Sequence, residues 1–141
     1  DIVPVEAPPL RRVGVGRRLV LDQPATIAEL AERMKAFLGR SRTRAAVPDA
    51  SQKITSIAVV PGAGESLLPL AKREGCELFM TGEMKHHEVM AALHGGVGVL
   101  LAGHTNTERG YLARLAPRLS GLLDGHEVLL SDADVDVLQV L

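Results

Sequence analysis

Two stretches of the chain combine side chains that bind metals or transfer protons. They are residues 81–88, Thr-Gly-Glu-Met-Lys-His-His-Glu, and residues 103–108, Gly-His-Thr-Asn-Thr-Glu. In the second stretch His104 follows an apolar run, and Glu108 comes four residues later, about one helical turn on. An imidazole nitrogen and a carboxylate oxygen at that spacing can bind one divalent cation. His104 and Glu108 are therefore candidate metal ligands, although two ligands do not make a site and a metal would need others from elsewhere.

A second interpretation of Glu108 needs no metal. Residues 105–108, Thr-Asn-Thr-Glu, have the capping-box pattern, in which a Thr hydroxyl and a Glu carboxylate satisfy free backbone N–H groups at a helix start. This pattern accounts for Glu108 and leaves His104 unexplained. Both interpretations stay open at this point.

The adjacent His86 and His87 are expected in the first turn of a helix, near the positive end of its dipole. That position disfavours protonation, and a neutral imidazole suits metal binding or proton transfer. Neighbouring residues on a helix point about 100° apart, so both rings cannot easily serve one site. We expect one functional and one structural histidine, the alternative being two surface residues.

Residues 61–66, Pro-Gly-Ala-Gly-Glu-Ser, form a glycine-rich turn before an expected helix. Such turns can bind an anion with their backbone N–H groups. Leu67 stands where a dinucleotide-binding fingerprint needs glycine, and Leu68 where a nucleophile elbow around Ser66 needs one. A tight turn without a ligand is therefore favoured.

The elements that must position these residues alternate between strand and helix patterns. Thr26 and Glu29 form a capping box, and Gly39 ends the helix that follows. Strands are expected at 11–21, 43–47, 54–60, 78–80, 97–102 and 128–130, and helices at 27–38, 65–73, 85–93 and 106–122. This alternation predicts an α/β fold with a mainly parallel or mixed sheet flanked by helices, and ligands at the carboxyl ends of the strands. We divide the chain into a basic segment, 1–52, and an α/β core, 53–141.

Composition excludes several classes of protein. The chain has 141 residues, 46% hydrophobic and 23% charged, which suits one compact domain or part of one. Its single cysteine excludes an internal disulfide framework and a cysteine-based zinc site. The longest apolar runs, such as 97–102, are too short to cross a bilayer. No signal peptide is visible, and because the sequence starts at Asp1 we expect a piece of a longer chain.

Charge is unevenly distributed, although the net charge is −1. Residues 1–56 carry ten Lys and Arg against six Asp and Glu, a balance of +4, whereas residues 57–141 carry six against eleven, a balance of −5. A basic section can attract phosphates, but aromatic residues that stack on bases are nearly absent, so a solvated surface is favoured over a nucleic-acid interface. Asp132, Asp134 and Asp136 lack the glycine and glutamate of a calcium-binding loop and are expected to be solvated.

Three blocks of sequence, in this order and spacing, resemble the NIF-three-like family, also described as GTP cyclohydrolase I type 2 homologues or dinuclear-metal-centre proteins. The blocks are Val60–Ser66, Leu78–Glu88 and Gly103–Gly110. Each block alone is a weak match, whereas the combination is specific. The stretches Gly14–Arg17 and Ser131–Val140 are similar to the animal-type branch of the family.

The resemblance implies two divalent metal ions per complete site, with His104 and Glu108 as ligands; Zn, Fe, Mn and Mg are not distinguished. It also nominates Glu83 and His87 as catalytic residues, for substrate binding or proton transfer. The remaining ligands of the family, a His-His pair followed by Asp, belong to an N-terminal half that this chain lacks. We therefore expect a C-terminal half that carries half of a metal site and joins a ring-shaped homo-oligomer, a hexamer in the family.

Two functional hypotheses follow from this resemblance. In the first, the chain is part of a metal-dependent hydrolase, whose two metals activate water on a nucleotide-like or phosphate-bearing substrate. In the alternative, it belongs to a non-catalytic metal-binding scaffold for a transcription-related protein or a nucleic acid, with Arg11–Arg18 as the contact. A third reading is a fragment that only self-associates through exposed strand edges. A cytoplasmic location is expected, with the nucleus as a second one, and no membrane.

Overall fold

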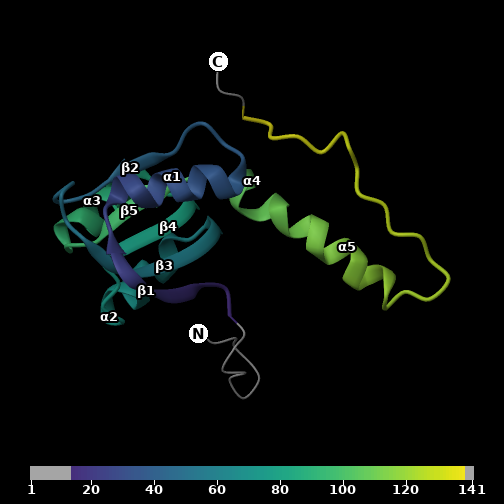
Figure 1. The fold of residues 1–141 in the computed structure, drawn as a ribbon, viewed down its shortest axis with the longest axis horizontal. Coiled ribbons are helices and arrows are strands. Elements are labelled where there is room, and N and C mark those ends of the chain that lie inside the picture. The colour runs from purple at the N-terminus through teal and green to yellow at the C-terminus, as the bar shows by residue number, and fades with distance from the viewer. Residues whose placement is uncertain (1–13, 139–141) are drawn as a thin grey trace.

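The computed structural model describes residues 14–138 (Figure 1). The expected strand at 11–21 therefore lies partly outside the described residues, as do Arg11 and Arg12. The described elements are β1 (Arg17–Ala25), α1 (Ile27–Leu38), β2 (Arg44–Ala46), β3 (Ile54–Ala63), η1 (Glu65–Leu67), α2 (Leu68–Arg73), β4 (Leu78–Glu83), α3 (His86–His94), β5 (Gly98–Leu101), α4 (His104–Glu108), η2 (Arg109–Tyr111) and α5 (Leu112–Ser120).

The strands form one mixed sheet in the order β1-β3-β4-β5-β2. The three central strands are parallel, with Ile57 opposite Leu78 and Leu78 opposite Gly98. Both edge strands run antiparallel to their neighbours, and in one of these pairs Arg44 lies opposite Leu101. The predicted α/β class with a mainly parallel or mixed sheet is confirmed.

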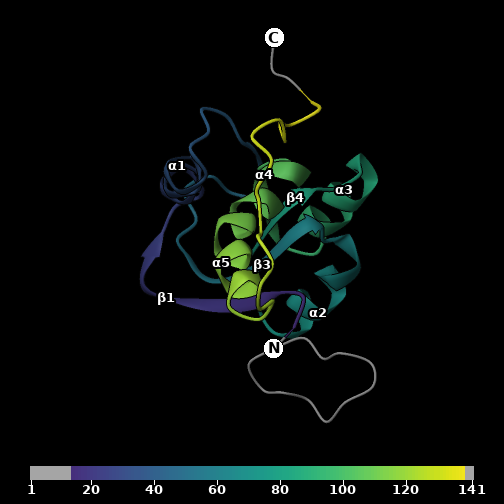
Figure 2. The same ribbon diagram turned by 90° about the vertical axis from the view of Figure 1, so that its right-hand side faces the viewer.

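Helices cover both faces of the sheet. Figure 2 shows α1 on one side of the sheet and α2 and α3 on the other. Because successive residues of a strand point to opposite faces, each of the three central strands contributes side chains to two separate cores. Leu78 and Leu100 pack in the core that includes α1, whereas Phe79 and Val99 pack in the core that includes α2 and α3. All four side chains are buried, so their packing holds β4 and β5 in place up to the carboxyl edge of the sheet.

Helix α1 begins and ends as the sequence predicts. The Thr26 hydroxyl accepts a hydrogen bond from the Glu29 backbone N–H at 3.3 Å, and the Glu29 carboxylate accepts one from the Thr26 N–H at 2.6 Å. Gly39 ends the helix with a φ of 63°, a left-handed conformation that suits glycine.

The C-terminal region differs from the prediction. The expected helix at 106–122 is divided into α4, η2 and α5, and it starts earlier, at His104. The Asn106 side chain donates to the Ala102 carbonyl at 2.7 Å, a local bond that starts the helix before its predicted first turn. Gly110, a poor helix former, lies where the helix tightens into η2. The strand expected at 128–130 does not form.

Helix α5 points away from the sheet (Figure 1). It is strongly amphipathic, yet none of its residues is buried among the residues that the structure describes. Leu112 is exposed, as are Leu122 and Leu123 just after the helix. No helix within residues 14–138 is long and apolar enough to cross a membrane.

Candidate metal centre

The carboxyl ends of β4 and β5 bring the two predicted motifs together. Strand β4 ends at Glu83, and β5 leads through Gly103, with a φ of 92°, directly into α4 and His104. The pairing of the two strands continues past β5, because Gly103 N–H donates to the Gly82 carbonyl at 2.8 Å. Glu83 and His104 thus lie side by side at the edge where open α/β sheets bind ligands.

His104 lies between two glutamates. Its Nδ1 is 2.8 Å from Oε1 of Glu83, and its Nε2 is 3.3 Å from Oε2 of Glu108. Since a carboxylate only accepts hydrogen bonds, Nδ1 carries the proton toward Glu83. The three side chains are 43%, 48% and 53% exposed for His104, Glu83 and Glu108, so the group is open to solvent and to ligands.

The carboxylates raise the pKa of His104 above its usual 6.5. The hydrogen bond with Glu83 is the largest cause, because it favours the charged imidazolium. Burial acts in the opposite direction, and the negative charges of Glu108 and Glu83 raise the pKa further. The site therefore attracts positive charge, whether a proton or a cation.

Two glycines allow α4 to lie against the strand ends. A Cβ on Gly62 would stand 2.5 Å from Oε1 of Glu108 and 3.3 Å from Nε2 of His104. A Cβ on Gly82 would stand 2.7 Å from the Gly62 carbonyl oxygen and 2.8 Å from Cα of His104. The glycine-rich turn predicted at 61–66 thus does more than reverse the chain, because it gives Glu108 room beside the backbone.

Threonines hold the same three segments together. Thr107 Oγ1 accepts from the Gly62 N–H at 2.9 Å and donates to the His104 carbonyl at 2.8 Å. Thr81 is buried, and its hydroxyl donates to the Gly62 carbonyl at 3.0 Å. Sequence reasoning missed Gly82, Thr81 and Thr107 as supporting residues. The Thr at 107 was visible only as part of the capping-box pattern.

The capping-box interpretation of Glu108 is wrong. Helix α4 is capped by Gly103, without a side-chain hydrogen bond, and Glu108 is its last residue rather than its third. The Glu108 carboxylate instead lies near the His104 ring. The early start of α4 explains the difference, since it moves Glu108 from the third to the fifth position of the helix, about half a turn further along.

The two histidines of α3 are not brought to this group. His86 and His87 form the first turn of α3, as predicted, and both are exposed. His86 lines a separate cavity with Met84, Val89 and Arg44. The His87 side chain makes no hydrogen bond or ion pair with any residue that the structure describes. A role of His87 in proton transfer stays a prediction.

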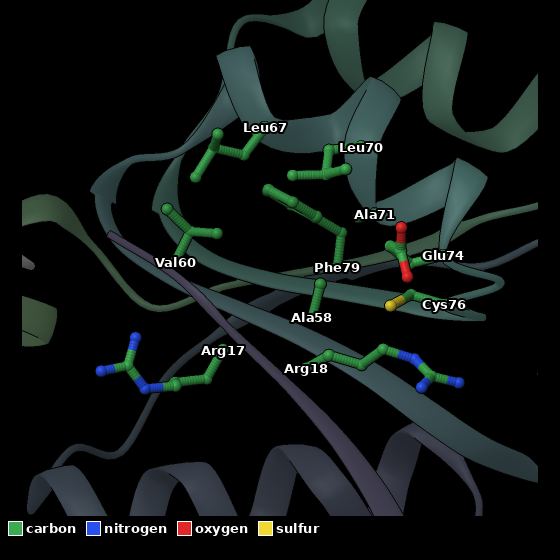
Figure 3. A pocket seen from close by; sticks show the side chains of 10 residues that line it. All are labelled: Arg17, Arg18, Ala58, Val60, Leu67, Leu70, Ala71, Glu74, Cys76 and Phe79. Atoms are coloured by element: carbon green, nitrogen blue, oxygen red, sulfur yellow. The ribbon is translucent and has the colours of Figure 1, made fainter. Parts of the chain in front are cut away.

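A different cavity, of about 130 Å³, lies between α2 and the sheet (Figure 3). Figure 3 shows Val60, Leu67, Leu70 and Phe79 converging on it. The guanidinium groups of Arg17 and Arg18 point away from these apolar side chains (Figure 3). Its lining includes one carboxylate, that of Glu74, and no histidine. This cavity lacks paired groups for acid–base or metal chemistry, unlike the group around His104.

A family model matches residues 5–136, nearly the whole chain, and it describes Duf34/NIF3, the NGG1p interacting factor 3. The chain belongs to the Duf34/NIF3 family. Among its curated relatives, NIF3-like protein 1 of Homo sapiens is 34% identical and aligns with all of this chain, but with only 38% of its own length. NGG1-interacting factor 3 of Saccharomyces cerevisiae is 34% identical over 91% of this chain and 46% of its own length.

Solved NIF3-type structures share the fold. Hypothetical protein SA1388 of Staphylococcus aureus superposes with a TM-score of 0.76 and 26% identity, covering 91% of this chain and 43% of that one. The Bacillus cereus protein related to NIF3 has a TM-score of 0.75 at 23% identity, covering 91% and 36%. This NIF3 chain therefore spans less than half the length of these relatives.

The donor set of this NIF3 chain fits part of a metal centre. Two ligands at about 2.0–2.1 Å from a tetrahedral zinc ion lie about 3.3–3.4 Å apart. The observed separation of 3.3 Å between Nε2 of His104 and Oε2 of Glu108 matches that edge. Within residues 14–138, no group of three or more His, Cys, Asp and Glu side chains is arranged to hold a metal ion. A complete centre would need further ligands.

Proposed function

We propose that this NIF3 chain contributes His104 and Glu108 to a two-metal centre of a hydrolase that acts on nucleotide-like or phosphate-bearing substrates. The observation that carries the proposal is the position of His104, with one nitrogen toward Glu83 and the other toward Glu108. Bound divalent metals would supply activated water and stabilise negative charge on the substrate.

Each of the three side chains has a distinct part in this proposal. The Glu83 carboxylate accepts a hydrogen bond from Nδ1–H of His104, which leaves Nε2 free as a ligand, a pairing typical of metal-bound histidines. Glu108 offers its carboxylate beside that nitrogen. Glu83 is then a positioning residue, whereas the family resemblance nominated it for substrate binding or proton transfer. The remaining ligands would come from the part of the family's longer chains that precedes this segment, or from neighbours in a ring-shaped oligomer.

A direct test measures Zn²⁺ and Mn²⁺ affinity by competition with a chromophoric chelator. We expect His104→Ala and Glu108→Gln to lose at least tenfold in affinity, because each removes one of two ligands. His126→Ala, which changes an exposed histidine of the C-terminal segment, is the matched control and should bind like the original chain. Equal affinity in all four proteins would contradict the proposal.

The reaction requires a second experiment on a full-length family member that carries this segment. Hydrolysis of GTP and of simple phosphate esters, followed by chromatography of the products, should depend on added metal. The variant equivalent to Glu108→Gln should lose activity together with metal. Retained activity without bound metal would exclude the two-metal mechanism.

The name of the yeast relative, NGG1-interacting factor 3, supports the second candidate function, a scaffold for a protein partner. In that case His104 and Glu108 would bind a structural metal. Substitution of either residue would then weaken partner binding, and the unsubstituted full-length protein would already show no hydrolytic activity.

A further inference from the structure

A cavity of about 540 Å³ opens directly beside His104. Glu83, His104 and Asn106 line it on the side of the candidate metal centre. Its lining also includes Lys35 near the end of α1, the segment 41–44, and Asp136 and Leu138 of the C-terminal segment. Its volume lies within the range of about 300–1,000 Å³ that is usual for sites of small ligands.

The topology explains why a basic segment lies here. Because β2 runs antiparallel to β5, the first residue of β2, Arg44, pairs with the last residue of β5, Leu101. The segment before β2, which includes Arg42, therefore reaches the carboxyl edge of the sheet, where α4 begins. Parallel pairing would have carried these arginines to the opposite edge.

The charges in the cavity are three cations and two carboxylates. Lys35 is already paired with Glu32 at 2.6 Å. Of the two carboxylates, Glu83 is engaged by His104, and Asp136 accepts the Leu138 backbone N–H at 3.1 Å. The side chains of Arg42 and Arg44 are exposed and make no hydrogen bond or ion pair with any residue within 14–138.

We propose that Arg42 and Arg44 bind the phosphate group of a small phosphate ester in this cavity. The proposal rests on the proposed function and assigns two specificity-determining residues to it. Guanidinium groups present paired N–H donors that match phosphate oxygens, and they stay charged at all physiological pH values. A phosphate held by them would lie across the cavity from His104, with its ester near the candidate metal ligands.

A small ester is favoured over a nucleic-acid strand. The cavity is enclosed by α1, the segment 41–44, the ends of β4 and β5, α4 and the C-terminal segment near Asp136, and no aromatic side chain lines it. Proteins that bind single strands combine a basic groove with aromatic side chains that stack on bases.

Binding of inorganic phosphate, followed by NMR in the presence of EDTA, tests the proposal without any metal. We expect Arg42→Gln and Arg44→Gln each to raise the dissociation constant about tenfold, the loss of one charge-assisted contact. Arg33→Gln removes an exposed arginine of α1 outside the cavity and should change the dissociation constant for phosphate less than twofold. Both target side chains are exposed, so the variants should keep the amide spectrum of the fold.

Three results would overturn the proposal. The first is that the unmodified chain does not bind phosphate, and the second is that Arg33→Gln weakens phosphate binding as much as the two target variants do. The third is that a single-stranded oligonucleotide binds more tightly than phosphate and that all three variants weaken its binding equally. Two separate assays distinguish this proposal from the proposed function. The phosphate titration in EDTA contains no metal, so its failure would contradict the arginine subsite alone. The Zn²⁺ and Mn²⁺ titration of His104→Ala and Glu108→Gln contains no phosphate, so its failure would contradict the metal centre alone.

Discussion

Nδ1 of His104 lies 2.8 Å from Oε1 of Glu83, although the two residues belong to different elements, 21 positions apart. The last residue of β4 thereby sets the orientation of a ring that the first residue of α4 provides. The consequence is that Nε2, the nitrogen on the other side of the ring, faces Glu108. Substitutions at Glu83 and His104 test this contact, and substitutions at Gly82 and Thr107 test the backbone that supports it.

In the metal-free chain, Glu83→Gln should lower the pKa of His104 toward 6.5, because it removes the largest cause of the raised pKa. NMR titration of the His104 ring measures the shift directly. Glu127→Gln, which changes an exposed residue outside the site, should leave the pKa of His104 unchanged. An unchanged titration in Glu83→Gln would mean that the hydrogen bond does not persist in solution.

The raised pKa of His104 determines in which direction the free energy of unfolding changes with pH. A pKa that is higher in the folded than in the unfolded chain stabilises the fold at pH values below about 6.5. That contribution disappears as the pH rises through the folded-state pKa of His104. Urea unfolding of the metal-free chain across this window should therefore show a steeper loss of stability than His104→Ala shows. Parallel pH profiles for the two proteins would contradict the assignment.

Glu83→Gln should also weaken metal binding by about 10–100-fold, the usual effect of losing the partner of a metal-bound histidine. The change leaves both expected ligands in place, so it separates positioning from ligation. Chelator competition with Zn²⁺ gives the affinity. An unaltered affinity would show that Glu83 does not orient a ligand.

Gly82→Ala should destabilise the fold by about 1–3 kcal/mol, because the added methyl group would overlap backbone atoms of Gly62 and His104. Thermal or urea unfolding measures the change. Gly110→Ala is the matched control, since a Cβ there meets no atom within 4 Å of the described structure. If the two variants unfold alike, α4 does not lie as close to β4 as described.

Thr107→Val should cost about 1–3 kcal/mol of unfolding free energy, because it keeps the shape of the side chain and leaves the buried Gly62 N–H without its acceptor. Thr105→Val is the control, as Thr105 makes no side-chain hydrogen bond to a described residue. Hydrogen exchange of the Gly62 amide should accelerate in Thr107→Val alone. Protection of that amide in both variants would contradict the role of Thr107.

The sequence predicts the fold well where local rules decide the structure. Thr26, Glu29 and Gly39 mark the ends of α1 because capping depends on residues within one turn. The apolar runs around Val60 and Leu100 identify central strands because strands covered on both faces are apolar throughout. His104 and Glu108 were chosen from their spacing and their family resemblance, and the structure places them side by side.

Contacts between distant segments escape such rules. The antiparallel direction of β2 determines that Arg44 reaches the cavity beside His104, and nothing in the sequence of the segment 41–46 specifies that direction. The same is true of Gly82, whose missing side chain matters only because Gly62 and α4 press against it. The starting point of α4 depended on an Asn106 side-chain bond that competes with the capping-box pattern.

The pairing of β2 with β5 also has a consequence for the order in which the molecule is assembled. Arg44 leaves the ribosome long before Leu101, its partner in the sheet, has been synthesised. Pairings so distant in sequence form late in folding, because a long loop must close first. The cavity between Arg44 and His104 therefore forms only after β5 has been synthesised and has paired with β2. A chain stalled or truncated before β5 would lack the strand that brings Arg44 to the same edge of the sheet as the candidate metal ligands.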